Sequence, residues 1–106
     1  MNGTPPDDGA LLRAAGDRLE QLAARSTPGD WRLGGLLASR PEVIAHAADG
    51  GTEHVAEARA TTAAWIVALS PALAGPLVTW LRSAAAETPA EPAAVDLARL
   101  LLDRLP

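Results

Sequence analysis

The chain has 106 residues, of which 48% are hydrophobic, a formal net charge of −4 and no cysteine. This length suits one domain with its own core, and the lack of cysteine excludes disulfide frameworks and thiolate metal sites. The nine basic residues are all arginine and lie scattered along an acidic chain, which disfavours nucleic-acid binding. Such binding would require convergence of Arg18, Arg25, Arg32 and Arg40.

Composition and sequence pattern also predict the source and the cellular location of the protein. Abundant alanine, arginine without lysine and the absence of Phe and Tyr are typical of GC-rich bacteria such as actinobacteria. The N-terminus MNGTPPDDG lacks the pattern of a signal peptide, and we find no apolar run near the roughly 20 residues that span a bilayer. We therefore expect a cytoplasmic protein with no membrane contact and a single domain over residues 1–106, with residues 1–4 frayed.

The first predicted helix runs from about Pro5 to about Arg25. Thr4 is the expected N-cap, followed by Pro5 in the first turn. Gly16 costs about 1 kcal/mol relative to alanine in a helix, so it indicates a close approach by another element. The apolar positions at helical spacing are Leu12, Ala15, Leu19, Leu22 and Ala23.

A β-section follows a turn at Pro28-Gly29. Two short strands are expected, over Trp31–Ser39 and Glu42–His46, as the arms of a hairpin, and Asp49-Gly50-Gly51 supplies the next turn. From Thr52 the chain forms either a third short strand to Ala56 or a helix, and the spacing of its apolar residues favours the helix.

The second half of the chain is predicted to be helical. A new helix starts at Ser70-Pro71, and Pro76 predicts a kink or a fresh start. We expect Trp65 and Trp80 in the core. The last helix begins near Thr88-Pro89 or after Pro92, and its apolar stripe is Val95, Ala98, Leu101, Leu102 and Leu105. The predicted fold is α+β and mainly helical, with three or four helices packed on a small antiparallel hairpin or three-stranded sheet.

The candidate chemical site is the pair His46 and His54, which flank the Asp-Gly-Gly turn, with Glu53 and Glu57 nearby. This set could bind a ligand or metal ion, but its spacing matches no known metal motif, and histidines near a turn are more often solvated. The serines lack a neighbouring base and the paired glycines lack a phosphate-loop pattern. We expect no cofactor and favour a non-enzymatic role.

Two candidate interfaces stand beside this site. Trp31 follows a turn and could anchor a partner, although packing on the first helix is the simpler interpretation. In the last helix Leu100, Leu101 and Leu102 cannot all face one stripe, so Leu101, Leu102 and Leu105 could form a homodimer contact.

Two short motifs carry a family resemblance. They are Ser26-Thr27-Pro28-Gly29-Asp30-Trp31, where Asp30 replaces a usual proline, and Glu53-His54-Val55-Ala56-Glu57-Ala58-Arg59. Over roughly residues 10–82 the chain resembles small phage and prophage-associated proteins of the Ead-like type and related actinobacterial proteins. The resemblance implies a small accessory protein of a mobile element and no chemistry at particular residues.

The leading functional hypothesis is a non-enzymatic interaction or accessory protein that acts through a Trp31 surface or the C-terminal helix. The alternative is a small enzyme or ligand-binding module at His46, His54, Glu53 and Glu57.

Overall fold

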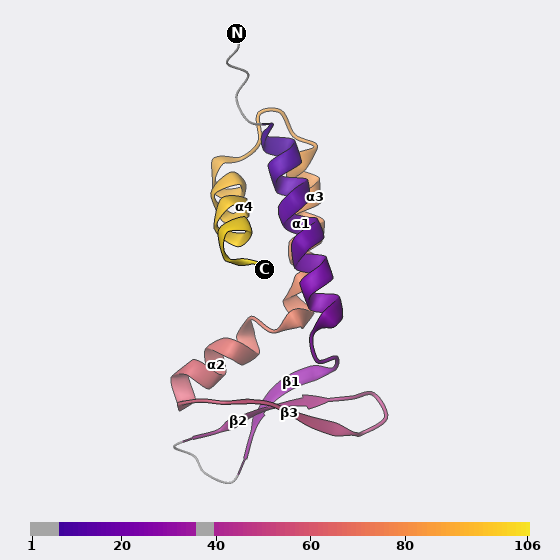
Figure 1. Ribbon diagram of the computed structural model, residues 1–106, viewed down its shortest axis with the longest axis vertical. Coiled ribbons are helices and arrows are strands. Elements are labelled where there is room, and N and C mark those ends of the chain that lie inside the picture. The colour runs from indigo at the N-terminus through magenta and orange to yellow at the C-terminus, as the bar shows by residue number, and fades with distance from the viewer. Residues whose placement is uncertain (1–6, 36–39) are drawn as a thin grey trace. The chain divides into compact units, whose positions relative to one another are not determined.

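The computed structural model describes residues 7–35 and 40–106, and this part of the chain has an α+β fold (Figure 1). The predicted fold class is therefore confirmed. In chain order the elements are α1 (Asp8–Arg25), β1 (Asp30–Gly34), β2 (Glu42–His46), β3 (Thr52–Glu57), α2 (Ala60–Ala68), the 3₁₀ turn η1 (Pro71–Leu73), α3 (Ala74–Ala85) and α4 (Pro92–Arg104).

The chain divides into two compact units. Unit 1 joins the two ends of the chain, Met1–Ala23 and Ala74–Pro106, and unit 2 is the middle segment, Ala24–Leu73. One domain over residues 1–106 stays a prediction, because a division into compact units does not show whether they unfold together. The expected frayed residues 1–4 and the Thr4 cap lie outside the described residues.

In unit 1, helices α1, α3 and α4 lie side by side (Figure 1), and their small apolar side chains form a core. Leu12 of α1 and Leu81 of α3 are fully buried. The remaining core residues are Ala15, Ala84, Ala94, Val95 and Ala98. Because most of these side chains are short, each buries little area, and the two buried leucines supply the largest share of the hydrophobic stabilisation.

A helix cap and an arginine bridge fix the position of α1 in unit 1. The Gly9 N–H donates to Oδ1 of Asp7 at 2.9 Å, so Asp7 caps the observed helix start. Arg82 of α3 donates to both carboxylate oxygens of Glu20, at 3.1 and 3.2 Å, and to Asp17 Oδ1 at 2.9 Å. These bonds raise the pKa of Arg82 above its already high value, and the hydrogen bonds to Glu20 contribute more than the hydrogen bond to Asp17.

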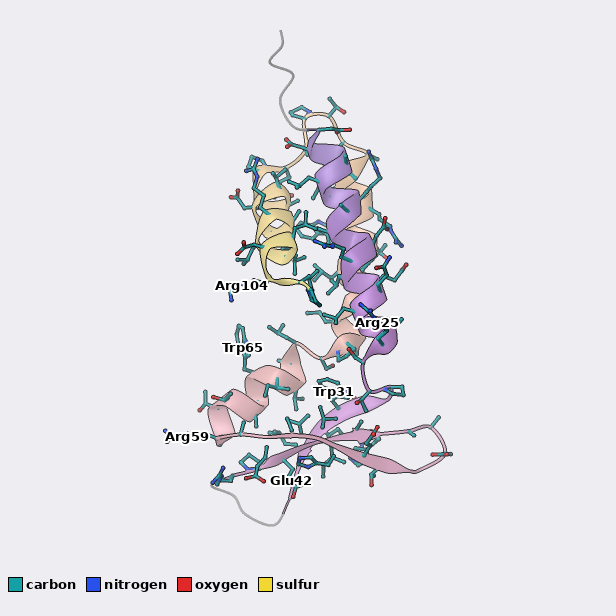
Figure 2. All side chains as sticks on the ribbon, in the orientation of Figure 1. Arg25, Trp31, Glu42, Arg59, Trp65 and Arg104 are labelled. Carbon is teal, nitrogen blue, oxygen red and sulfur yellow. The ribbon has the colours of Figure 1, made fainter. Side chains whose placement is uncertain are left out.

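Unit 2 is an antiparallel sheet in the order β1-β2-β3 with α2 against β1 and β2. Val43 and Ala45 of the central strand and Ala63 of α2 are buried. Trp31 is paired with Ala45 and therefore lies on the same face of the sheet, and its indole N–H donates to the Thr27 carbonyl at 3.0 Å. Trp31 thus packs within unit 2, on the α2 side of the sheet (Figure 2).

Most predicted element boundaries are close to the observed ones. β2 has the predicted bounds, and β1 starts one residue earlier, while the predicted extension of that strand to Ser39 reaches residues 36–39, which lie outside the described chain. Gly50 has a φ of 90° in the turn between β2 and β3, as the Asp-Gly-Gly pattern predicts. α3 starts afresh just before Pro76, and α4 starts at Pro92.

The preference for a helix from Thr52 was wrong. Residues 52–57 form β3, which pairs with β2. β2 is buried at Val43 and Ala45, so it needs a partner strand on each side to satisfy its backbone groups. The short turn at residues 47–51 returns the chain directly to that free edge, and strand pairing overrides the helical spacing.

Candidate functional site

The outer side of α2 carries an exposed tryptophan. The helix sequence ATTAAWIVA has no charged residue, and its buried residue, Ala63, lies on the side that meets the sheet. Trp65 is two positions further along, about 200° around a helix of 3.6 residues per turn. Its exposed fraction is 68%, and Figure 2 shows it directed away from the sheet. The prediction that Trp65 belongs to the core was wrong.

Two exposed leucines continue this surface along the chain. Leu69 is 51% exposed and lies one turn after Trp65, with its N–H donating to the Trp65 carbonyl at 3.1 Å. Leu73 follows four residues later, at the end of η1, and is 39% exposed. We call Trp65, Leu69 and Leu73 the apolar patch; all three belong to unit 2.

Small residues accompany each large residue of the apolar patch. Ala64, Ala68 and Ala72 each precede one of the three large residues, and all three alanines are exposed. On α2 the exposed side chains form two neighbouring rows at four-residue spacing. A row of large side chains runs through Trp65, and a lower row of small side chains runs through Ala64 and Ala68. The outer side of α2 therefore carries no charge and is mostly apolar, with the exposed Thr61 one turn before Trp65 in the same row.

The apolar patch lies in a longer apolar stretch. By length and composition, Ala60–Ala85 could cross a membrane: the most apolar part has a mean hydropathy of 1.6 and is 22% buried. The expectation that no run approaches this length was therefore wrong. The stretch is not one regular α-helix, since α2 ends at Ala68 and η1 precedes α3. Because core helices of soluble proteins can pass the same test, it does not by itself place the chain in a membrane.

The leucines predicted for a dimer interface face their own helix bundle. Leu101 and Leu102 pack against the core cluster of unit 1, and Leu105 is half-buried. The outward leucine of α4 is Leu100, which is 50% exposed. Trp80 of α3 is 40% exposed, so its predicted place in the core was also wrong. An interface at Trp31 or at the leucines of α4 stays a prediction.

The strand register places three of the four residues of the predicted chemical site on one face of the sheet and the fourth on the other. His46, His54 and Glu57 lie on the sheet face opposite α2, because their strand partners share the alternation of Glu42, Ile44 and His46. Glu53 is paired with buried Ala45 and lies on the other face. His54 and Glu57 are three residues apart in the six-residue strand β3, yet they lie on the same face. This is possible because the register of β3 with β2 shifts between Val43 and Ile44.

Polar side-chain contacts occupy the sheet face opposite α2. Nδ1 of His54 lies 2.9 Å from Glu42 Oε2, and the Arg40 guanidinium lies 3.2 Å from Glu57 Oε1. The described residues contain no cluster of three or more His, Cys, Asp or Glu side chains arranged to hold a metal ion. Two predicted site residues are thus engaged with partners that sequence spacing did not identify, Glu42 and Arg40.

The sequence does contain a signal for the apolar patch. No charged residue occurs between Arg59 and Arg82, although that segment is longer than one amphipathic helix needs. A helix without charged residues, in which Thr61 and Thr62 are the only polar side chains, must be enclosed on most sides or must expose part of its apolar surface. The small sheet can cover one side of α2, which leaves the side with Trp65 exposed.

Comparison with protein-family models, curated proteins and solved structures finds no match for this chain.

Proposed function

We propose that this protein is a small non-enzymatic interaction protein that binds a protein partner through the apolar patch. The observation that carries this proposal is the exposure of Trp65 beside Leu69 on a helix face without charge. Contiguous exposed apolar surface of this kind marks contact sites, and tryptophan is enriched among the residues that dominate binding energy.

The setting we propose is the bacterial cytoplasm, in an accessory protein of phage or mobile-element type. The arginine-rich, lysine-free composition and the motifs around Trp31 and His54 support this assignment. The role is compatible with the small size of the chain, because a contact surface needs no enclosed catalytic cleft.

A ligand or metal site on the sheet face opposite α2 is the second candidate. Its support is the shared face of His46 and His54, which are diagonal neighbours on paired strands. Isothermal titration with Zn²⁺ would test it: a site predicts saturable binding that is lost in His46→Ala. Unchanged binding in that variant would reject a site at these histidines.

Affinity capture with three baits tests the leading proposal. The tagged wild-type chain, Leu69→Asp and the control Leu100→Asp are each incubated with an extract of the native host, and the retained proteins are compared by mass spectrometry. The two leucines have nearly equal exposed fractions, 51% and 50%. We expect Leu69→Asp to lose a retained protein that Leu100→Asp keeps; equal retention by all three baits would contradict the proposal.

A further inference from the structure

We propose that the partner of the apolar patch is a second copy of this chain, joined through the outer sides of two α2 helices. This inference rests on the proposed function, because it uses the same surface and specifies what binds there. The two copies would be related by a two-fold axis, so that the same residues contribute from both sides.

Charge is the first reason to favour a second copy. The exposed side of α2 has no charged residue, and Arg59 stands before its first turn. Two such surfaces meet without burying an unpaired charge, which is strongly unfavourable in an apolar contact. An anionic lipid surface is a poorer occupant, since the chain carries a net charge of −4 and has one arginine beside the patch.

Shape is the second reason. The row through Trp65 and Leu69 stands beside the lower row of Ala64 and Ala68. Rows at four-residue spacing interdigitate when two helices cross at roughly 50°. The large side chains of each copy can then occupy the alanine row of the other, so one surface provides both the ridge and the groove.

The size of the patch sets the expected strength of the dimer. Trp65, at 68% exposure, offers on the order of 150 Å². With its two leucines and three alanines, each copy can bury roughly half of the ~800 Å² per partner of a standard interface. We therefore expect a weak dimer that dissociates on dilution and has a dissociation constant on the order of 10 µM.

Sedimentation equilibrium tests the proposal over concentrations from about 1 µM to about 500 µM, on either side of the expected dissociation constant. The wild-type mass should rise from 10.9 kDa toward twice that value. Leu69→Asp should remain at the monomer mass, whereas Leu100→Asp should behave as the wild type. Ala68→Arg, which places a charge in the alanine row, should also remain monomeric, and circular dichroism confirms that each variant is folded.

Three results would overturn the inference. A monomeric wild type at the highest concentration rejects the dimer, and a dimer that persists in both Leu69→Asp and Ala68→Arg places the contact elsewhere. Monomeric protein that cosediments with phosphatidylcholine–phosphatidylglycerol vesicles, in a manner lost in Leu69→Asp, assigns the patch to lipid. If the wild type is monomeric while Leu69→Asp still loses a captured host protein, the self-association fails and the proposed function stands.

Discussion

The three tryptophans of the chain have three different environments. Trp31 is half-buried on the α2 side of the sheet and donates its indole N–H to Thr27. Trp80 is 40% exposed on α3, and Trp65 is 68% exposed on α2. Aliphatic neighbours at helical spacing predicted a core position for the last two. Spacing identifies which residues share a side of a helix but does not show which side has a partner.

Gly16 should be replaceable with a gain in stability. It is buried between α1 and α3, yet a Cβ there would lie 3.6 Å from Val78 Cγ1, an ordinary van der Waals distance. Gly16→Ala should therefore raise the free energy of unfolding by about 1 kcal/mol, because alanine loses less backbone entropy in a helix. Urea denaturation followed by circular dichroism measures the change, and a loss of stability would show that α1 and α3 approach more closely than the structure indicates.

Gly29 should respond in the opposite direction. Its φ is 107°, and a Cβ would lie 2.7 Å from the His46 carbonyl oxygen across the sheet. Gly29→Ala should lower the free energy of unfolding by more than about 1 kcal/mol, because both the backbone angle and the space exclude a side chain. The same urea titration compares it with Gly16→Ala, and a neutral effect would contradict the described approach of the two backbones.

Arg82 should stabilise unit 1 in a salt-dependent way. Its hydrogen bonds to Glu20 and Asp17 join α3 to α1 across an exposed surface. Arg82→Ala should lower the urea midpoint, and this effect should shrink as the Debye length falls from about 10 Å at 0.1 M salt to about 3 Å at 1 M. Arg99→Ala is the control, since Arg99 has one distant partner, Asp96 at 3.9 Å. Equal effects of the two substitutions would contradict a structural role for the Arg82 bridge.

For the helices and strands, local sequence patterns predicted helix starts and turns better than they predicted which strands pair. Pro92 at the start of α4 and Gly50 in the strand turn are governed by backbone geometry within a few residues, so they could be predicted. β3 could not, because its conformation depends on the free edge of β2. Of the candidate site, the shared face of His46 and His54 required the strand register, and the contacts of His54 with Glu42 and of Glu57 with Arg40 required the folded structure.

Truncation of a leucine in the unit 1 core should cost far more stability than truncation of an exposed leucine. Leu81 is fully buried in the unit 1 core, whereas Leu100 on α4 is half exposed. Leu81→Ala should cost about 2–5 kcal/mol of unfolding free energy, and Leu100→Ala should change it by less than about 0.5 kcal/mol. Thermal and urea denaturation measure both values. Similar costs for the two leucines would contradict the described orientation of α4.

At the scale of the whole molecule, the buried apolar residues fall into two sets, one in each compact unit. Unit 1 contains Leu12 and Leu81, while the buried apolar residues of unit 2 are Val43, Ala45 and Ala63. Because each unit buries so few apolar residues, each of its helices and strands is covered on one side only. The uncovered side of α2 therefore follows from the limited size of the sheet, and the same shortage of cover makes the apolar patch available for a partner.

Hydrogen exchange should distinguish the two units. Leu81→Ala removes contacts within unit 1, so amides of α1, α3 and α4 should exchange faster while those of β2 keep their wild-type rates. Mass spectrometry of peptic fragments resolves these segments. Equal acceleration in β2 would show that both units unfold together, as a single domain over residues 1–106 requires.

Measuring the exposure of Trp65 tests most directly whether the outer side of α2 is available for contact. Acrylamide quenching of tryptophan fluorescence is compared between the wild type and Trp65→Leu at about 1 µM, below the expected dissociation constant, and at about 500 µM. We expect Trp65→Leu to remove the most readily quenched component in dilute solution, and we expect this component to be protected in the concentrated wild type. A quenching curve that Trp65→Leu leaves unchanged in dilute solution would contradict this expectation, because Trp65 would then be covered within a single chain.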